Sequence, residues 1–209
     1  QDEDALLFYT ALPETDTSVA SAILSSKKSG AADASFYGWN LNSDLYMSSM
    51  PDWSFHWGHV TPRAVKGSMN MNMVEYQLNT QNDEAYQRRA LETLHWFHGR
   101  NALGKVMLSN MYEFGAEDSV NEFYHSWFSD GSKWDSVLTD IGPAPGYLVG
   151  GPNKDYTGTT APPANEPPSK SYIDYNAGWP DSSWEITENA IYYQAAYLRL
   201  LAYFVSSGR

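Results

Sequence analysis

A long segment rich in proline and glycine restricts the fold of this chain more than any other feature. Residues 142–180 hold 8 of the 11 prolines and 6 of the 15 glycines. Proline lacks a backbone N–H and glycine loses the most conformational freedom on folding, so this segment cannot be a helix. Loops of this length in compact domains are usually functional or disordered. The regular structure must therefore come from the residues on either side.

Helical patterns precede this long loop. The acidic residues 2–4 precede an apolar run that ends at Pro13, and this order is typical of a helix with an acidic first turn. After Asn82, a favourable cap, apolar residues recur at helical spacing until Gly99. Residues 29–60 are rich in Gly, Ser, Asn and aromatic residues, and they predict an irregular segment.

The last part of the chain predicts one long helix over 182–205, apolar on much of its circumference. Ser182 and Glu185 have the spacing of a capping box at its start. The apolar run 103–114 fits another short helix, and no alternating pattern of useful length indicates a strand. The sequence therefore predicts an all-α fold with long ordered loops.

The composition excludes several classes of partner. The 25 acidic residues outnumber the 13 basic ones and give a formal charge of −12, so nucleic acid and anionic membranes are poor partners. No apolar stretch approaches the roughly 20 residues that span a bilayer. The chain has no cysteine, which excludes thiol chemistry. Aromatic residues make up 15% of the chain, and such side chains either fill a core or stack on sugar rings.

The histidines raise the question of a metal site. His56 and His59 are three residues apart, as are His95 and His98, and this spacing places two imidazoles on one side of a helix. Zinc needs further ligands, and the sequence has neither a His-Glu-x-x-His motif nor a cysteine. We therefore predict no metal site and expect these histidines to pack among aromatic side chains. His125 lies within residues 121–131, where polar and aromatic residues alternate. This pattern fits a loop that contacts a ligand as well as a loop that is packed.

Two carboxylates in the last predicted helix are candidates for acid catalysis. Glu185 and Glu188 are one helical turn apart in the most apolar part of the chain. Apolar surroundings and a nearby like charge favour the protonated carboxyl that a general acid needs. Glu185 is better explained as a capping residue, whereas spacing alone leaves Glu188 open between a catalytic and a solvated residue. The Gly150-Gly151 pair lacks the Lys and Ser/Thr of a phosphate loop.

Several motifs in a fixed order carry a resemblance to a known family. They are Gly-Arg-Asn at 99–101, Ser-Asn-Met-Tyr-Glu-Phe-Gly at 109–115, Leu-Val-Gly-Gly-Pro-Asn at 148–153 and Trp-Glu-Ile-Thr-Glu-Asn-Ala at 184–190. Together they resemble the C-terminal half of the catalytic domain of family-nine glycoside hydrolases, the inverting endoglucanases or cellulases. The resemblance is good over residues 82–205 and implies part of an (α/α)6 barrel. It implies that residues 1–209 are the C-terminal portion of a single catalytic domain, with the N-terminal portion outside this sequence.

The resemblance also assigns roles to individual residues. Glu188 resembles the catalytic acid, His125 resembles a histidine that contacts the sugar, and Tyr193 resembles a tyrosine that lines the site. Trp127 stands where the family has the arginine of its His-x-Arg motif, and we expect it to help hold the sugar. Asn165-Glu166 resembles the Asn-Glu of the family, but two prolines follow it, so we reject Glu166 as the acid.

The sequence departs from the family at several positions. Thr187 stands where an Asn usually precedes the acid, and Gln194 stands where an Asn usually follows it. The family activates water with an aspartate from an Asp-Ala-Gly-Asp-like motif, and the nearest match, residues 30–33, lacks the second carboxylate. Because an inverting mechanism needs an acid and a base on opposite sides of the sugar, we expect the base to lie outside this sequence.

The activity that the resemblance implies is inverting hydrolysis of internal β-1,4-glucosidic bonds in cellulose or a related β-glucan. No cofactor is required, although Asp2 and Glu3 resemble an acidic pair that helps hold calcium in some members. A polymeric substrate implies an extracellular or periplasmic location. Two alternatives stay open: a non-catalytic carbohydrate-binding or structural fragment, and a relative that acts on an amino sugar.

Overall fold

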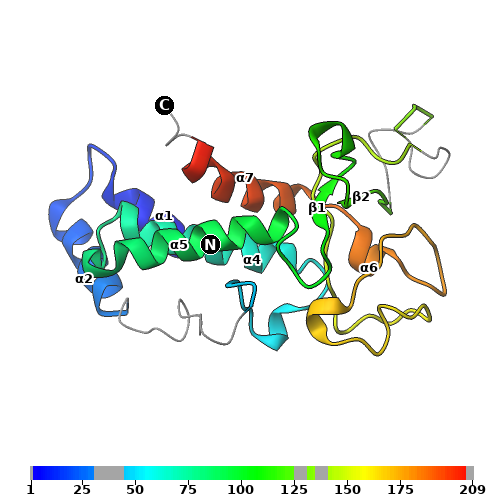
Figure 1. Ribbon diagram of the computed structural model, residues 1–209. Coiled ribbons are helices and arrows are strands. Elements are labelled where there is room, and N and C mark those ends of the chain that lie inside the picture. Colours follow the sequence, from blue (N-terminus) through cyan, green and yellow to red (C-terminus); the bar gives the residue numbers. More distant parts are fainter. Residues whose placement is uncertain (1, 31–44, 125–130, 135–140, 206–209) are drawn as a thin grey trace.

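The computed structural model describes residues 2–30, 45–124, 131–134 and 141–205. Helices α4, α5 and α7 lie side by side at its centre (Figure 1). Helices α1 and α2 form a pair at one end, and the strands, α6 and the long loop gather at the other end (Figure 1). In chain order the elements are α1 (Asp2–Thr10), α2 (Thr17–Gly30), η1 (Asp52–Ser54), α4 (Val60–Glu75), η2 (Thr80–Asn82), α5 (Asp83–Phe97), β1 (Val106–Ser109), η3 (Tyr112–Phe114), β2 (Ser119–Val120), η4 (Pro168–Lys170), α6 (Trp184–Thr187) and α7 (Ile191–Val205).

The main core lies where the three central helices meet the long loop. Ala64 of α4, Phe97 of α5 and Leu200 of α7 are fully buried, and Leu148 and Val149 of the long loop belong to the same cluster. The long loop contains only the short turn η4 as regular structure, as its proline and glycine content predicts. None of the described helices has the length and apolar character needed to cross a membrane.

Helix α4 has no counterpart among the helices predicted from the sequence. Several of its buried residues are polar, including Arg63, Lys66 and Asn72, so apolar side chains do not mark its inner face. Arg63 can be buried because its guanidinium lies 4.1 Å from the ring centre of Trp96 and donates a hydrogen bond to the Ser48 carbonyl oxygen at 2.5 Å. Such compensation depends on residues distant in sequence, and no local pattern reveals it.

The apolar run 103–114 is not a helix, contrary to the prediction. It forms β1 and η3, and β1 pairs in parallel with β2. Leu108 of β1 also forms an antiparallel bridge with Leu148 of the long loop. The segment is therefore held by backbone pairing with two distant segments, which an isolated helix pattern cannot anticipate.

The last predicted helix is interrupted. Helix α6 ends at Thr187 and α7 begins at Ile191. The carbonyl oxygen of Ile186 accepts a hydrogen bond at 2.9 Å from the N–H of Gly151 in the long loop. A distant backbone donor therefore takes the acceptor that a continuous helix would use for the residue four positions later. The residues between the two helices begin with Glu188.

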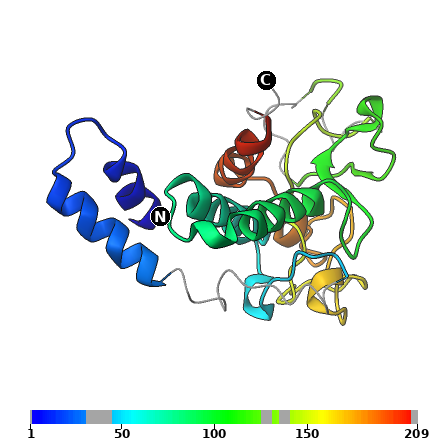
Figure 2. The ribbon, with the colours of Figure 1, turned by 60° about the vertical axis from the view of Figure 1, so that its left-hand side comes forward.

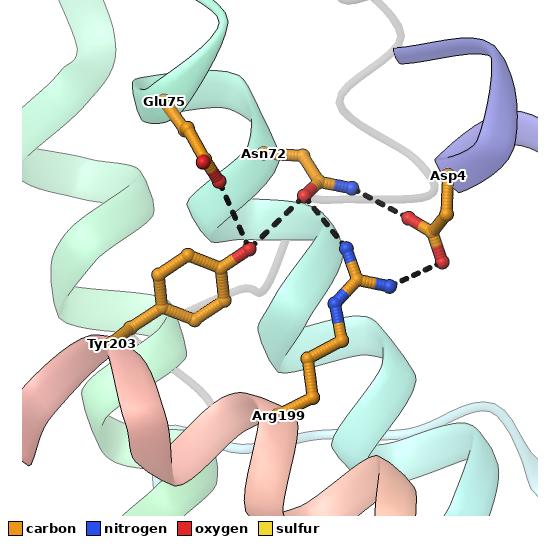
Figure 3. Close-up of polar contacts among 5 residues, drawn as sticks. All are labelled: Asp4, Asn72, Glu75, Arg199 and Tyr203. Carbon is orange, nitrogen blue, oxygen red and sulfur yellow. Dashed lines mark hydrogen bonds and ion pairs between the residues drawn. The ribbon is translucent and has the colours of Figure 1, made fainter. Parts of the chain in front are cut away.

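A polar network fixes α1 against the central helices, although Figure 2 shows the α1–α2 pair at the edge of the molecule. Arg199 of α7 pairs with Asp4 at 2.5 Å and donates to the amide oxygen of Asn72 at 3.1 Å (Figure 3). Asn72 of α4 donates in turn to Asp4 at 2.8 Å, and Tyr203 donates to Glu75 at 3.1 Å. Burial alone would raise the pKa of Asp4, but the hydrogen bonds from Arg199 and Asn72 outweigh it and lower that pKa.

Candidate active site

Glu188 lies at the break between α6 and α7. Its backbone is extended, with φ −63° and ψ 138°, so the chain leaves α6 at this residue. Ile186 and Thr187 are both fully buried, whereas Glu188 is partly exposed. Thr187 stands where the family usually has an Asn. Its hydroxyl donates to the carbonyl oxygen of Ser183 at 2.9 Å, so the threonine stabilises α6. The partly exposed Glu188 therefore directly follows two fully buried residues.

The long loop holds this break in position. Besides the bond from Gly151 to α6, the carbonyl oxygen of Gly150 accepts a hydrogen bond at 3.3 Å from the N–H of Val60, at the start of α4. Gln194 of α7 forms two hydrogen bonds with the backbone of Leu148, each 2.9 Å long. The motif at 148–153 thus joins α4, α6 and α7 around Glu188.

Two aromatic side chains lie beside the Glu188 carboxylate. The indole N–H of Trp57 donates to Oε2 of Glu188 at 3.2 Å. Tyr193 is buried, and its pKa is raised by burial, with further contributions from Tyr192 and the charge of Glu188. Gly58 allows Tyr193 to pack here, because a Cβ at position 58 would lie 2.6 Å from the tyrosine hydroxyl and the backbone has φ +84°.

The structure thus brings together Glu188 and Tyr193, two of the residues predicted for the site, and adds Trp57. Sequence reasoning placed Trp57 only in an aromatic, irregular segment. The separation of 131 residues between Trp57 and Glu188 explains why no local spacing could pair them.

Glu185 does not cap the helix, contrary to the prediction. Ser182 has a left-handed backbone (φ 51°), and the cap residue Ser183 makes no side-chain hydrogen bond to the helix. The buried Glu185 carboxylate instead accepts hydrogen bonds from the N–H and the hydroxyl of Thr157, at 2.9 and 2.5 Å. These bonds fasten the long loop to α6, so Glu185 has a structural role.

The segment that leads to residue 125 is anchored by Asp174. The Asp174 carboxylate accepts hydrogen bonds from the backbone N–H groups of Asn121 and Glu122, at 2.7 and 3.1 Å. The ring of Tyr124 packs against Trp184 of α6 at a centroid distance of 5.2 Å. Burial, together with the charge of Asp174, raises the pKa of Glu122 to about 7.

Part of the predicted site falls outside the described residues. His125 and Trp127 belong to that part, and so do the side chains of Asp2 and Glu3, the expected calcium pair. Their roles stay predictions. Within the described ranges, no three His, Asp or Glu side chains are grouped so that they could hold a metal ion.

Two of the described histidines are packed among aromatic side chains. His59 is fully buried and stacks on Phe55 at a ring distance of 4.1 Å. Its Nδ1 donates to the Ser54 carbonyl oxygen at 2.8 Å, and its Nε2 accepts from Arg63 at 3.1 Å. Burial, and then the charge of Arg63, lower the pKa of His59 well below its usual value. His98 contacts the Tyr197 hydroxyl at 2.8 Å. Both agree with the packing that we expected.

Comparison with protein families gives a match over most of the chain. The sequence model of glycosyl hydrolase family 9 matches residues 6–201. The comparison with curated protein sequences finds no match.

Solved structures with a similar fold include endoglucanases. AaCel9A, solved in complex with cellobiose-like isofagomine, superposes with a TM-score of 0.70 and 21% identity, over 96% of this chain and 35% of its own. A thermostable endoglucanase (D468A) from Alicyclobacillus acidocaldarius gives a TM-score of 0.69 and 21% identity, over 96% of this chain and 34% of its own. The family 9 endoglucanase J30 gives a TM-score of 0.68 and 22% identity, over 95% of this chain and 33% of its own. The chain therefore spans about a third of these relatives and shares the fold of that third.

Proposed function

This chain belongs to glycosyl hydrolase family 9, forms part of an (α/α)6 barrel, and on this basis we propose that it carries the catalytic acid of an inverting endoglucanase. The substrate would be cellulose or a related β-1,4-glucan. Such a polymer does not enter cells, so the protein would act outside the cell or in the periplasm.

The position of Glu188 is the observation that carries this proposal. Its carboxyl group is partly exposed at a helix break, beside Trp57 and Tyr193. Glu185, three residues earlier, is buried and holds the Thr157 backbone and hydroxyl. Of these two carboxylates, only Glu188 is accessible to a substrate. A partly buried carboxyl group next to aromatic side chains suits a general acid that protonates a glycosidic oxygen.

Sugar binding would use the aromatic and polar side chains around this carboxyl group. Trp57 is 46% exposed, so its ring face can stack on a sugar. The Tyr193 hydroxyl is protonated at neutral pH, since the ordinary pKa of a tyrosine is 10.0 and burial raises the pKa of Tyr193 further. His125 and Trp127 would complete the contacts from the loop that Asp174 anchors.

The base of the reaction would come from the rest of the catalytic domain. An inverting glycosidase places its two carboxyl groups about 6.5–9.5 Å apart, on opposite faces of the sugar. About two thirds of the length of each relative named above lies outside the part that this chain matches. That remainder is the partner that we propose for this chain, and its aspartate would activate the attacking water.

The substitution Glu188→Gln in the complete catalytic domain tests this function. Loss of a general acid lowers kcat on soluble β-1,4-glucan by about 10²–10⁴-fold, because the leaving oxygen departs without a proton. Glu185→Gln is the matched control, since Glu185 acts structurally. Unchanged glucan hydrolysis in Glu188→Gln would contradict the assignment.

A second candidate is a carbohydrate-binding or structural fragment without activity, which the missing paired-aspartate motif favours. An assay of the purified 209-residue chain on soluble β-glucan separates these two candidate functions. We expect binding without turnover from the chain alone. Turnover would mean that the base lies within these residues. Products from glucan and glucosamine oligomers, compared side by side, would distinguish the amino-sugar alternative.

A further inference from the structure

The contact between Trp57 and Glu188 assigns a role to a residue that the sequence did not single out. Trp57 lies in the irregular segment between η1 and α4, and its indole N–H donates to Oε2 of Glu188 at 3.2 Å. An indole N–H can only donate a hydrogen bond, whereas a carboxyl group can donate from one oxygen when it is protonated. The contact therefore treats the two oxygens of Glu188 differently.

We propose that Trp57 is a positioning residue that directs the acidic proton of Glu188 onto Oε1. This inference rests on the proposed role of Glu188 as general acid. Because Oε2 accepts the indole hydrogen bond, it serves as the carbonyl oxygen of the protonated carboxyl group. The proton then resides on Oε1, from which it passes to the glycosidic oxygen as the bond to the leaving sugar breaks. The carboxylate that remains keeps the hydrogen bond at Oε2.

The segment around Trp57 is held firmly enough for this role. His56 Nδ1 lies 2.8 Å from the carbonyl oxygen of Trp57, and the N–H of Thr61 donates to the carbonyl oxygen of Gly58 at 3.0 Å. Gly58 packs directly on Tyr193, the other aromatic residue beside Glu188. The segment of Trp57 is thus bonded to the start of α4 and packs on the start of α7, which begins three residues after Glu188.

The indole resonance of Trp57 tests the contact without any need for activity. In a proton–nitrogen spectrum of the ¹⁵N-labelled chain, the indole peak that disappears in Trp57→Phe belongs to Trp57. We expect this peak to move with pH as Glu188 ionises, and to stop moving in Glu188→Gln. A peak that moves equally in both proteins would overturn the proposal.

The other groups that can titrate near this contact have to be separated from Glu188. His56 is the adjacent one, so His56→Gln serves as the control, and the pH response of the Trp57 peak should survive in it. The charge of Glu188 also acts on Tyr193, but the ordinary pKa of a tyrosine, 10.0, lies outside the acidic range, and burial raises the pKa of Tyr193 further. Glu185 is tied to Thr157 on the long loop, and Glu185→Gln should also leave the response in place.

Kinetics of Trp57→Phe in the complete catalytic domain test the consequence. Phenylalanine keeps an aromatic face for the sugar but lacks the donor. We expect kcat on β-1,4-glucan to fall about tenfold, as for the loss of one charge-assisted hydrogen bond, with KM nearly unchanged. An aryl glycoside whose leaving group needs no proton should lose less than about twofold.

The matched control is Trp53→Phe, because Trp53 is also exposed and lies four residues away in η1. We expect it to keep both activities. Equal losses on both substrates in Trp57→Phe would mean a merely structural or sugar-binding role and would overturn the proposal. Failure of the proposed function would appear separately, as unchanged glucan hydrolysis in Glu188→Gln.

Discussion

At the scale of single residues, environment separates carboxylates that the sequence treats alike. Glu185 and Glu188 are three positions apart; spacing predicted a capping role for Glu185, which the structure contradicts, and left the role of Glu188 open. Glu185 is buried and accepts a hydrogen bond from Thr157, whereas Glu188 accepts one from the indole of Trp57. Both partners lie in loops distant from α6, so the assignment of Glu188 came from the family resemblance rather than from local pattern.

Glu122 gives a prediction for stability against pH. Burial and the charge of Asp174 raise its pKa from 4.5 to about 7 in the folded chain. The folded state therefore holds this proton more tightly than the unfolded state, and the stability it provides is present below pH 4.5 and lost as the pH rises through 7. Glu122→Gln removes that loss. We expect the variant to be more stable than the native chain at pH 8 by about 1 kcal/mol, after allowance for solvent screening.

Urea unfolding at pH 4 and pH 8 measures this difference. At pH 4 the two proteins should have nearly equal free energies of unfolding, because Glu122 is protonated in the folded state and largely protonated in the unfolded state. Glu117→Gln, at an exposed position nearby, is the control and should show no such dependence. A stabilisation that is the same at both pH values would argue against titration of Glu122 as its source.

At the scale of elements, periodicity predicted the helices with a continuous apolar face and missed α4, whose buried residues are mostly polar. Helix α5 begins at Asp83, as its pattern predicts, although Asn82 makes no side-chain cap. Helix α4 buries Arg63, Lys66 and Asn72, which are satisfied by distant partners, and it escaped prediction. The break at Glu188 was also missed, because the hydrogen bond that competes with the helix comes from Gly151.

Gln194 gives a prediction for the element that surrounds the break. Its amide binds both the N–H and the carbonyl oxygen of Leu148, a residue with 0% exposure. Gln194→Leu fills a similar volume but leaves these two backbone groups without their partner. We expect the free energy of unfolding to fall by about 2–4 kcal/mol, since each buried unsatisfied group costs about 1–3 kcal/mol.

Chemical denaturation of Gln194→Leu beside Gln87→Leu measures this effect. Gln87 is exposed on α5, so its replacement should change stability by less than about 0.5 kcal/mol. Equal effects of the two substitutions would show that the contact between α7 and the long loop contributes nothing.

At the scale of the whole molecule, the polar network of Figure 3 joins α1 to the central helices, beside an apolar cluster in which Leu7 of α1 packs with Met73 and Tyr86. Arg199→Met keeps most of the apolar stem and removes the contacts to Asp4 and Asn72. We expect a loss of about 0.5–1 kcal/mol, because this ion pair is only partly buried. Hydrogen exchange should speed up in α1 and stay unchanged in α5.

Lys154→Met supplies the comparison for that prediction. Lys154 pairs at 2.6 Å with Asp155, its neighbour in sequence, so its loss should leave exchange in α1 unchanged. Faster exchange throughout the chain in Arg199→Met would mean global destabilisation rather than release of α1.

The central claim is that Glu188 supplies the proton to the leaving oxygen. The most direct measurement compares kcat/KM for a series of aryl β-glycosides of increasing leaving-group basicity, in the complete catalytic domain and in its Glu188→Gln variant. We predict a weak dependence in the native protein and a steep fall with leaving-group basicity in the variant, because only the poor leaving groups need protonation. Parallel dependences in the two proteins would contradict the claim.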